Sequence, residues 1–335
     1  MNPILSICIP TFNRAANLRL LLETLANELK EIQDKVNVII SNNASVDNTV
    51  SEVQHFINSF PTTCAIHQVK NLGPDENFAI CVEKVQTRYF WMISDDDLPK
   101  KGVLLRIIKL LESEDTDLLY LNSEWVPKIA NANDGEAINA LIRKIYSRLD
   151  FTREVNVWVT FISGMIINLA RLRELHPGIN IRRFTGTNLI QLGWILPLLM
   201  TGNRFHIVQQ RCVLATSGNT GGYKLFTVFG TNFPAILNLV CGNASCERKI
   251  IVKNLSWNYI PGLIWASRFE YPGKFTSENI LKGLAPLKCS PAYWLIMVPL
   301  AVFPRFIAIY FLFISKVFSV QQQVKKYFYS ATKYY

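Results

Sequence analysis

Cysteine in this 335-residue chain lacks the paired spacing that metal sites use. The seven cysteines are odd in number and scattered along the sequence. We therefore expect reduced, buried thiols of a cytoplasmic protein rather than a zinc site. The chain also lacks internal repeats, low-complexity segments and a visible signal peptide, since it enters an apolar strand almost at once.

An uninterrupted apolar run of about 20 residues, the length of a membrane-spanning helix, is also missing. The most apolar stretch, residues 291–320, contains Pro299, Pro304 and Arg305 near its middle. Arginine is unfavourable at the bilayer centre, and proline breaks a helix. We therefore favour two half-length helices that lie in the membrane interface and meet at residues 303–305. A single kinked span and a helix pair buried in the protein or a dimer remain alternatives.

Acidic residues are scarce in the second half of the chain. Residues 1–154 carry a net charge of −5, whereas residues 155–244 carry +6 and residues 245–335 carry +9. Because the basic part is also the apolar part, we expect the cytoplasmic membrane surface to be its partner. Nucleic acid is not expected, because no recognition motif is present and the acidic cluster at residues 95–97 would repel phosphates without a metal.

Side chains suited to a membrane interface accompany residues 291–320. Tyr293 and Trp294 match the headgroup level, where aromatic rings are favoured. Anionic lipid would attract the nearby lysines, which are Lys316, Lys325, Lys326 and Lys333. These residues support attachment to the cytoplasmic face of a bacterial inner membrane, as a peripheral or monotopic protein.

An aspartate cluster is the most informative feature that is present. Residues 89–93 form an apolar strand pattern, and Asp95, Asp96 and Asp97 follow directly. Adjacent carboxylates repel each other unless a cation lies between them. Oxygen ligands of this kind suit Mg²⁺ or Mn²⁺, which in turn bind phosphates. The alternative is an acidic turn that caps a helix beginning near Lys101.

Strand and helix patterns alternate through the N-terminal third. After the first strand, Asn13 is the expected helix cap, and leucines then recur at helical spacing. The five expected strands are residues 4–9, 36–40, 64–69, 89–93 and 117–121. This order predicts an α/β fold with a parallel sheet and helices on both faces. Ligands in such sheets bind beyond the carboxyl ends of the strands, where the turns at residues 10–11, 41–45, 71–73 and 95–97 fall.

Four segments of the sequence resemble motifs of the family 2 glycosyltransferases. They are Ile-Pro-Thr-Phe-Asn-Arg (9–14), Ser-Asn-Asn-Ala-Ser-Val-Asp (41–47), Asn-Leu-Gly-Pro (71–74) and the aspartate cluster. The resemblance is close over residues 3–125. Within the family, the motif sequences are most similar to those of bacterial O-antigen enzymes of the abequosyltransferase type. The resemblance implies a GT-A fold, a Rossmann-like, mostly parallel sheet with flanking helices.

The resemblance also implies roles for individual residues. Pro10, Thr11 and Phe12 would lie against the nucleoside of a nucleoside-diphosphate sugar, and Arg14 would lie near its phosphates. Asn43 stands where many relatives carry an aspartate that binds the nucleobase. An amide can donate a hydrogen bond to N3 of cytosine, which a carboxylate cannot do. We therefore favour a CDP-sugar, although Asn43 could also be a simple turn residue.

The aspartates would bind the metal and contribute to catalysis. By resemblance, Asp95 and Asp96 match the family's ribose and metal positions, and Asp97 is a third candidate ligand. A Mg²⁺ or Mn²⁺ at this place would act as a Lewis acid. It would stabilise the charge that develops on the departing diphosphate.

The acceptor half offers no clear catalytic base. An inverting transferase needs a group that deprotonates the acceptor hydroxyl. The only acid between residues 155 and 244 is Glu174, which matches the exposed face of a helix. His206, at the start of an expected strand, is a second candidate. A retaining mechanism, in which the donor phosphate receives the proton, is a third possibility. Arg182 and Arg183 are candidate phosphate ligands in this basic half.

Three regions are expected. Residues 1–126 would bind the nucleotide sugar, residues 127–245 the acceptor, and residues 246–335 the membrane. A linker at residues 127–136 would lead into a basic helix near 137–148.

The expected function is transfer of abequose from CDP-abequose to an undecaprenyl-pyrophosphate-linked O-antigen oligosaccharide. A rhamnosyl- or other deoxyhexosyltransferase that uses a dTDP- or UDP-sugar is the alternative, as is a non-catalytic subunit of a polysaccharide assembly complex. A nucleotidyltransferase is disfavoured, because residues 9–14 contain no glycine-rich loop.

Overall fold

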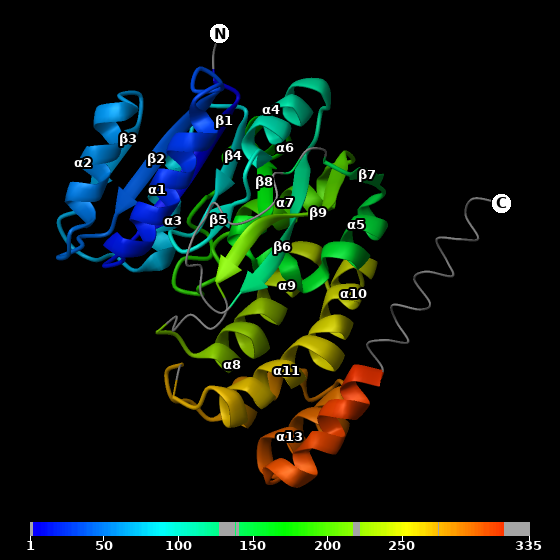
Figure 1. The fold of residues 1–335 in the computed structure, drawn as a ribbon. Helices are drawn as coiled ribbons and strands as arrows, with labels where there is room; N and C mark the ends of the chain where they lie inside the picture. The colour runs from blue at the N-terminus through cyan, green and yellow to red at the C-terminus, as the bar shows by residue number, and fades with distance from the viewer. Residues whose placement is uncertain (1–2, 127–137, 139–140, 217–221, 274, 318–335) are drawn as a thin grey trace. The chain divides into compact units, whose positions relative to one another are not determined.

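The computed structural model describes residues 3–126, 138, 141–216, 222–273 and 275–317. The chain divides into two compact units, Met1–Ser217 and Gly218–Tyr335, which we call the sheet unit and the helical unit. The helices and strands of both units are labelled in Figure 1. The predicted linker at residues 127–136 lies outside the described residues.

In the described part of the sheet unit, nine strands form one sheet in the order β3-β2-β1-β4-β8-β6-β9-β5, with β7 paired to β9. The strands are β1 (Leu5–Thr11), β2 (Val36–Asn42), β3 (Cys64–His67), β4 (Tyr89–Met92), β5 (Leu98–Pro99), β6 (Leu118–Val126), β7 (Arg143–Tyr146), β8 (Met165–Asn168) and β9 (Phe205–Thr216). The five predicted strands are confirmed as β1, β2, β3, β4 and β6.

The predicted parallel arrangement is correct for only one half of the sheet. Strands β3, β2, β1 and β4 are parallel. Beyond β4, strand β8 enters antiparallel between β4 and β6, and β9 then pairs parallel with β6. The sheet is therefore mixed, because a strand from the second half of the unit separates two strands that are neighbours in the N-terminal pattern.

Helices cover both faces of the sheet (Figure 1). They are α1 (Ala15–Leu29), α2 (Thr49–Ser59), α3 (Pro74–Glu83), α4 (Val103–Ser113), α5 (Arg148–Val155), α6 (Leu169–Leu175) and α7 (Leu192–Thr201). Side chains alternate along β4, as expected for a strand buried on both sides. Trp91 joins the core formed with α1 and α4, whereas Phe90 packs edge-on against Trp194 of α7.

Two local predictions in the sheet unit are wrong. Asn13 does not cap α1, because it adopts a positive φ of 52° and its side chain accepts from Val46 N. The first amide of α1, on Ala15, donates instead to Asp47 Oδ2. The basic helix predicted over residues 137–148 is replaced by strand β7 where the structure describes it, because pairing with β9 satisfies this backbone.

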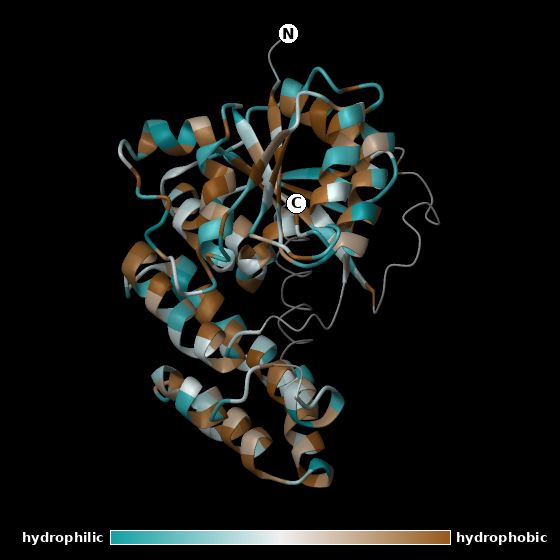
Figure 2. Cartoon of the chain, turned by 90° about the vertical axis from the view of Figure 1, so that its left-hand side faces the viewer, coloured by the Kyte–Doolittle hydropathy of each residue, from teal (hydrophilic) through white to brown (hydrophobic). Residues whose placement is uncertain are grey.

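The helical unit contains α8 (Leu225–Thr227), α9 (Phe233–Cys241), α10 (Cys246–Asn254), α11 (Ile260–Trp265), α12 (Ile280–Gly283) and α13 (Val298–Val302). Residues 305–317 form a further helix. Much of this unit is apolar, as the hydropathy colouring in Figure 2 shows. Two of its segments cross closely, since a Cβ on Gly230 would lie 2.5 Å from Gly283 O.

The predicted break near residues 303–305 is confirmed. Helix α13 ends at Val302, Phe303 is extended, and the next helix begins at Arg305. The Arg268 guanidinium donates to the carbonyls of Leu300 and Phe303 and thereby satisfies backbone groups that the break leaves without helical partners. None of the helices in the described part of the chain has the length and apolar character that crossing a membrane requires.

The cysteines are all free, as predicted. The prediction that they are buried is correct for only four of the seven, because Cys64, Cys246 and Cys289 are exposed.

Candidate active site

The predicted polar turns meet at the carboxyl ends of β1, β2 and β4. Thr11 pairs with Asn42 in the parallel register, and Ile93 N donates to Cys8 O on the other side of β1. Thr11 Oγ1 donates to Asp95 Oδ2 at 2.8 Å, so the first and fourth turns touch directly. The edge that sequence reasoning identified is thus assembled by hydrogen bonds between residues far apart in the chain.

Asp95 and Asp96 converge on the guanidinium of Arg14. One nitrogen, Nη1, lies 3.0 Å from Asp95 Oδ1 and 3.0 Å from Asp96 Oδ2. Burial raises the pKa of Asp95 to about 6, although Arg14 opposes the rise. Burial works against the charge of Arg14, but the two carboxylates outweigh it and raise the pKa of the guanidinium. Arg14, which was expected near the donor phosphates, occupies the cation position between the carboxylates in this structure.

Asp97 is held apart from this pair. Its Oδ2 accepts from Ser163 Oγ at 2.6 Å, and its Oδ1 accepts from Thr216 N at 3.1 Å. Burial, followed by the charge of Asp96, raises its pKa to about 7. Asp97 thus has protein donors on both oxygens, as Asp95 and Asp96 have, but it does not share their hydrogen bonds from Arg14.

The aspartate cluster does not serve as a helix cap. Glu28 of α1 accepts from Gly102 N and Leu104 N at 2.7 and 3.1 Å, which satisfies the start of α4. The alternative explanation of the acidic turn is therefore wrong. The carboxylates are buried at 3–5% exposure without a role in that helix, an arrangement typical of a functional site.

The Asn43 side chain is hydrogen-bonded to a second loop, the one that precedes α3. Its amide nitrogen donates to Asn71 Oδ1 at 2.9 Å and to Gly73 O at 3.2 Å. Its Oδ1 accepts from Leu72 N at 2.8 Å. Both amide hydrogens are thus committed, and the donor that was expected to face cytosine N3 is not free in this conformation.

The other nucleoside candidates differ in exposure. Pro10 is buried within β1, whereas Phe12 is 39% exposed just beyond the end of that strand. Of the residues expected to contact the nucleoside, Phe12 is thus the one whose side chain is available for stacking.

A buried amide that sequence reasoning missed supports this edge. Asn77 of α3 accepts from Ser41 Oγ and Gln68 Nε2, both at 2.7 Å, and donates to Ser41 O at 3.1 Å. Ser94 and Thr216 were missed as well: Ser94 Oγ donates to Asp96 Oδ1, and Thr216 Oγ1 donates to Asp96 O. The partner of Ser94 is two residues away, whereas the fold alone brings Asn77 to Ser41 and Thr216 to Asp96, so no local pattern identifies those two residues.

His206 and Glu174 lie away from the aspartates. His206 is at the start of β9, whereas Thr216, which contacts Asp97, ends the same strand ten residues later. At about 3.3 Å per residue, the two ends are roughly 30 Å apart. Glu174 is on α6, which follows the end of β8 that pairs with Tyr89 at the beginning of β4. The structure therefore brings neither candidate base to the site.

Arg182 and Arg183 are also engaged elsewhere. Arg182 Nε lies 2.9 Å from Glu76 Oε2, and its Nη1 pairs with Glu83, so α3 neutralises its charge. The Arg183 guanidinium lies 5.5 Å from the ring centroid of Phe184. The basic cluster seen in the sequence is thus largely a set of contacts within the sheet unit.

The donor set fits a divalent cation of the kind that is completed by substrate. Mg²⁺ sites beside phosphates commonly use one or two carboxylates, with phosphate and water as the remaining ligands. Asp95 and Asp96 offer one such pair, already aimed at a single cation. Among the described residues, no group of three or more acidic, histidine or cysteine side chains is arranged to hold a metal ion.

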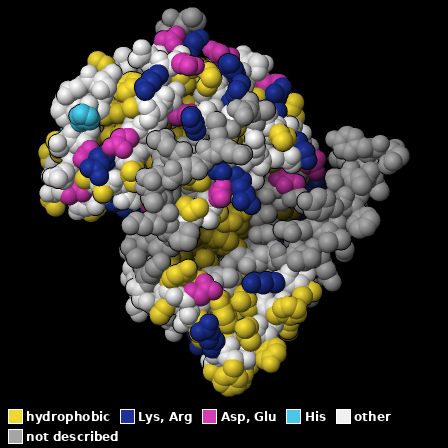
Figure 3. Space-filling view, viewed as in Figure 1, with side chains coloured by type: hydrophobic (Ala, Val, Ile, Leu, Met, Phe, Trp, Pro, Cys, Tyr) yellow, Lys and Arg dark blue, Asp and Glu magenta, His cyan; other side chains and the backbone are white. Residues whose placement is uncertain are grey.

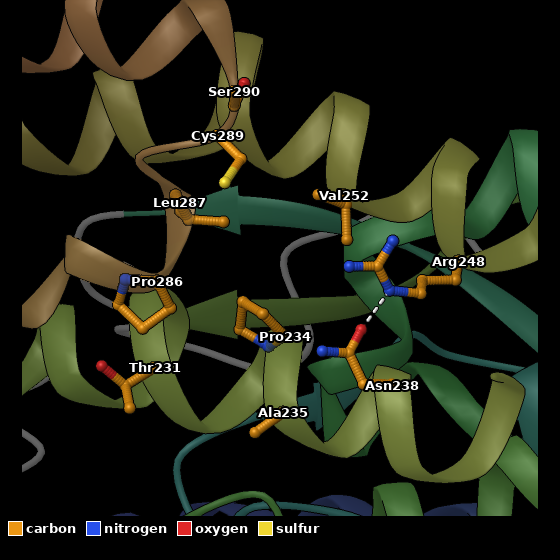
Figure 4. A pocket seen from close by; sticks show the side chains of 10 residues that line it. All are labelled: Thr231, Pro234, Ala235, Asn238, Arg248, Val252, Pro286, Leu287, Cys289 and Ser290. Atoms are coloured by element: carbon orange, nitrogen blue, oxygen red, sulfur yellow. Dashed lines mark hydrogen bonds between the residues drawn. The ribbon is translucent and has the colours of Figure 1, made fainter. Parts of the chain in front are cut away.

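A cavity of about 360 Å³ in the helical unit is unrelated to this chemistry. Figure 4 shows its lining, which comes mainly from apolar side chains of α9, α10 and the segment before α13. Arg248 is the charged residue among those lining it, and its guanidinium contacts Asn238 Oδ1. The cavity holds no carboxylate, so we place the candidate active site at the aspartates instead.

Comparisons with known proteins identify the family of the chain. The model of the family described as glycosyl transferase family 2 matches residues 6–183. Abequosyltransferase RfbV of Salmonella typhimurium is 35% identical over 113 residues, which span 33% of this chain and 33% of that protein.

Solved structures show the same GT-A-type fold. Residues 1–349 of TarS from S. aureus align with a TM-score of 0.57 and 14% identity, covering 80% of this chain and 76% of that one. The mannosyltransferase PcManGT from Pyrobaculum calidifontis, solved with GDP-Man and Mn²⁺, aligns with a TM-score of 0.52 and 15% identity over 95% and 87% of the two chains. On the match to the family model, which covers more than half of its residues, the chain belongs to glycosyltransferase family 2.

Proposed function

We propose that this chain transfers a sugar from a nucleoside diphosphate to a hydroxyl group of a glycan. The observation that carries the proposal is the convergence of Asp95 and Asp96 on one cation position at the carboxyl edge of β1 and β4. Membership of family 2 supports it. Buried carboxylates around a cation are suited to a diphosphate that gains charge as it departs.

Asp95 and Asp96 would hold the metal, and Mg²⁺ or Mn²⁺ would supply Lewis-acid stabilisation of the diphosphate. Thr11 and Ser94 orient the two carboxylates through hydrogen bonds of 2.8 and 2.5 Å. Arg14, once released from the carboxylates, has the charge and the forked donors that suit a phosphate. Phe12 offers an exposed ring to the nucleoside.

We propose that Asp97 is the base that accepts the proton of the acceptor hydroxyl. Its pKa of about 7 suits a group that accepts a proton near neutral pH. Ser163 and Thr216 fix the orientation of its carboxylate. For this role the sequence suggested Glu174, His206 or the donor phosphate. Glu174 and His206 lie away from the aspartates, whereas Asp97 directly follows Asp95 and Asp96 in the chain.

The donor proposed first is CDP-abequose, and the acceptor an undecaprenyl-pyrophosphate-linked O-antigen oligosaccharide. The likeness to an abequosyltransferase supports this choice, whereas the amide hydrogens of Asn43 no longer do. One observation favours a UDP- or dTDP-deoxyhexose as the second candidate. Asn43 Oδ1 keeps one lone pair beyond its bond from Leu72 N, and a carbonyl oxygen can accept from the N3–H of uracil or thymine.

We also propose peripheral attachment to the cytoplasmic face of the inner membrane. The helix at residues 305–317 presents an exposed apolar stripe, in which neighbours are mostly three or four residues apart: Phe306, Ile309, Tyr310, Phe313, Ile314 and Val317. Apolar side chains gather on the surface of this part of the helical unit in Figure 3. An outward apolar face of this kind suits the headgroup boundary. The predicted lipid contacts Lys325, Lys326 and Lys333 lie outside the described residues.

The test is calorimetric titration with CDP, UDP, GDP and dTDP, each with and without Mn²⁺, followed by transfer assays with the matching sugar nucleotides. Metal-dependent binding of CDP alone would support the first candidate, and binding of UDP or dTDP the second. The absence of binding to all four nucleotides would contradict the transferase proposal. Replacement of Asp97 by Asn should leave nucleotide binding intact and abolish transfer.

A further inference from the structure

A partly exposed aromatic cluster, with one exposed and two half-buried rings, lies in the second half of the sheet unit. We define it as Trp125, Trp158 and Phe161. The Trp125 ring centroid lies 5.6 Å from that of Trp158 and 4.9 Å from that of Phe161. Trp125 is 44% exposed although it is the largest kind of side chain. Water-exposed aromatic groups of this size usually mark a binding surface.

The cluster is tied to the aspartates at two points. Trp125 of β6 pairs in register with Ala215 of β9, and the next residue, Thr216, donates to Asp97. Phe161 precedes by two residues Ser163, whose hydroxyl donates to the other oxygen of Asp97. The ring of Phe161 approaches this segment closely, since a Cβ on Gly164 would lie 2.8 Å from its Cδ1.

The sheet order places the cluster on the acceptor side of the site. The nucleoside candidates belong to β1 and β2, on one side of the aspartate-bearing strand β4. Strand β6 lies on the other side, two strands from β4, which corresponds to roughly 10 Å. A group bound on Trp125 would therefore extend from the aspartates away from the nucleotide.

We propose that the aromatic cluster is the platform on which the acceptor sugar packs, a role that rests on the glycosyl transfer proposed above. A pyranose ring has an apolar face of C–H groups, and packing this face on an indole removes both surfaces from water. The hydroxyl groups at the ring's edge stay free for hydrogen bonds and for reaction. Asp97 is held by Ser163, two residues after Phe161, and by Thr216, which follows the strand partner of Trp125, so it would face one of these hydroxyl groups.

The test compares Trp125→Ala with Trp125→Phe and with a matched control, Trp294→Ala. Trp294 is 60% exposed and belongs to the helical unit. The probes are the methyl glycosides of mannose, galactose and rhamnose, observed by saturation-transfer NMR, and Mn²⁺-CDP or Mn²⁺-UDP, whichever the wild type binds, observed by calorimetry. Trp125→Ala should weaken glycoside binding roughly tenfold, with Trp125→Phe intermediate. Trp294→Ala should bind as the wild type does, and all variants should keep nucleotide affinity.

Three outcomes would overturn the inference. They are no glycoside signal from the wild type, an unchanged signal in Trp125→Ala, and a loss of nucleotide affinity in Trp125→Ala, which would assign the cluster to the nucleobase. Glycoside binding does not require turnover. A failure of the transferase proposal, seen as the absence of nucleotide binding, is therefore distinguished from a failure of the platform.

Discussion

At the residue scale, the site is governed by how three adjacent carboxylates avoid one another. Arg14 compensates Asp95 and Asp96, whereas hydrogen bonds from Ser163 and Thr216 hold Asp97 in a separate orientation. Buried carboxylates without such partners would bind protons instead of remaining charged. The raised pKa values of Asp95 and Asp97, about 6 and about 7, show that the compensation is incomplete in the metal-free protein.

Replacing Arg14 with Met should destabilise the metal-free protein by about 1–2 kcal/mol at pH 8. The loss is smaller than for a fully buried pair, because 35% of the Arg14 side chain is exposed. Without the guanidinium, the pKa of Asp95 rises further above its unfolded value, so the native state binds more protons and its stability falls as the pH rises. The destabilisation should therefore shrink at pH 5, as measured by urea unfolding in EDTA.

Arg19→Met is the matched control, since Arg19 is an exposed arginine of α1, the helix that begins just after Arg14, and is paired with Glu23. Equal destabilisation by Arg14→Met at pH 5 and pH 8 would show that the guanidinium does not compensate the carboxylates.

Replacing Asp96 with Asn should remove the response to metal. We expect Mn²⁺ to raise the Tm of the wild type, because a ligand that binds the native state stabilises it. This rise should disappear in Asp96→Asn, and transfer should fall by about 10²–10³-fold. Glu174→Gln, which alters an exposed carboxylate paired with Arg171, should leave both properties unchanged. A normal Mn²⁺ shift in Asp96→Asn would remove Asp96 from the metal site.

At the scale of elements, the helix at residues 305–317 has its apolar stripe on the exposed side. Ala308 and Ser315 face inward and are buried, and Ser315 Oγ donates to Trp257 O at 2.6 Å. An ordinary surface helix shows the opposite pattern, with its apolar face toward the core. An exposed apolar face is stable where the helix contacts an apolar environment outside the unit.

The double replacement Phe306→Gln and Phe313→Gln should weaken binding to lipid vesicles at least tenfold. These side chains are 71% and 67% exposed, and burying a phenylalanine contributes about 1.5–3 kcal/mol. The matched control is Ile142→Gln with Ile145→Gln, two residues that are 57% and 67% exposed in the sheet unit. Vesicle co-sedimentation measures the effect. Equal binding by both double variants would place the lipid contact elsewhere.

At the scale of the whole molecule, the net charge belongs to one unit. Residues 1–217 contain 22 basic and 22 acidic residues, whereas residues 218–335 contain 13 and 3. The net charge of +10 therefore lies in the unit that also carries the exposed apolar stripe. Charge and apolar surface together are the two components of binding to an anionic membrane.

Binding to vesicles should therefore depend on lipid charge and on salt. We expect partitioning onto vesicles with anionic lipid to exceed that onto zwitterionic vesicles. The difference should decrease between 50 and 500 mM NaCl, because the Debye length falls from about 14 to about 4 Å. Co-sedimentation across this range measures the effect. Salt-independent binding that is equal on both kinds of vesicle would show that the basic residues do not contact lipid.

The sequence by itself determined five of the strands and the sheet edge at which their polar turns meet. Period-two and period-3.6 patterns are local, so they identified β1, β2, β3, β4 and β6 and the edge at which their polar turns meet. The helix break at residues 303–305 could also be predicted from the sequence, because a proline in the interior of a helix breaks it.

Only the tertiary structure decided which partner each polar side chain takes. The insertion of β8 beside β4, the bond from Ser163 to Asp97 and the position of Arg14 between two aspartates all join residues more than 60 positions apart. The tertiary structure also decided which predicted site residues are engaged elsewhere. His206 is at the far end of β9, Arg182 is neutralised by α3, and the Asn43 amide donates to the loop before α3. The residue type determines which hydrogen bonds and ion pairs a side chain can make, whereas tertiary packing determines which of them it makes.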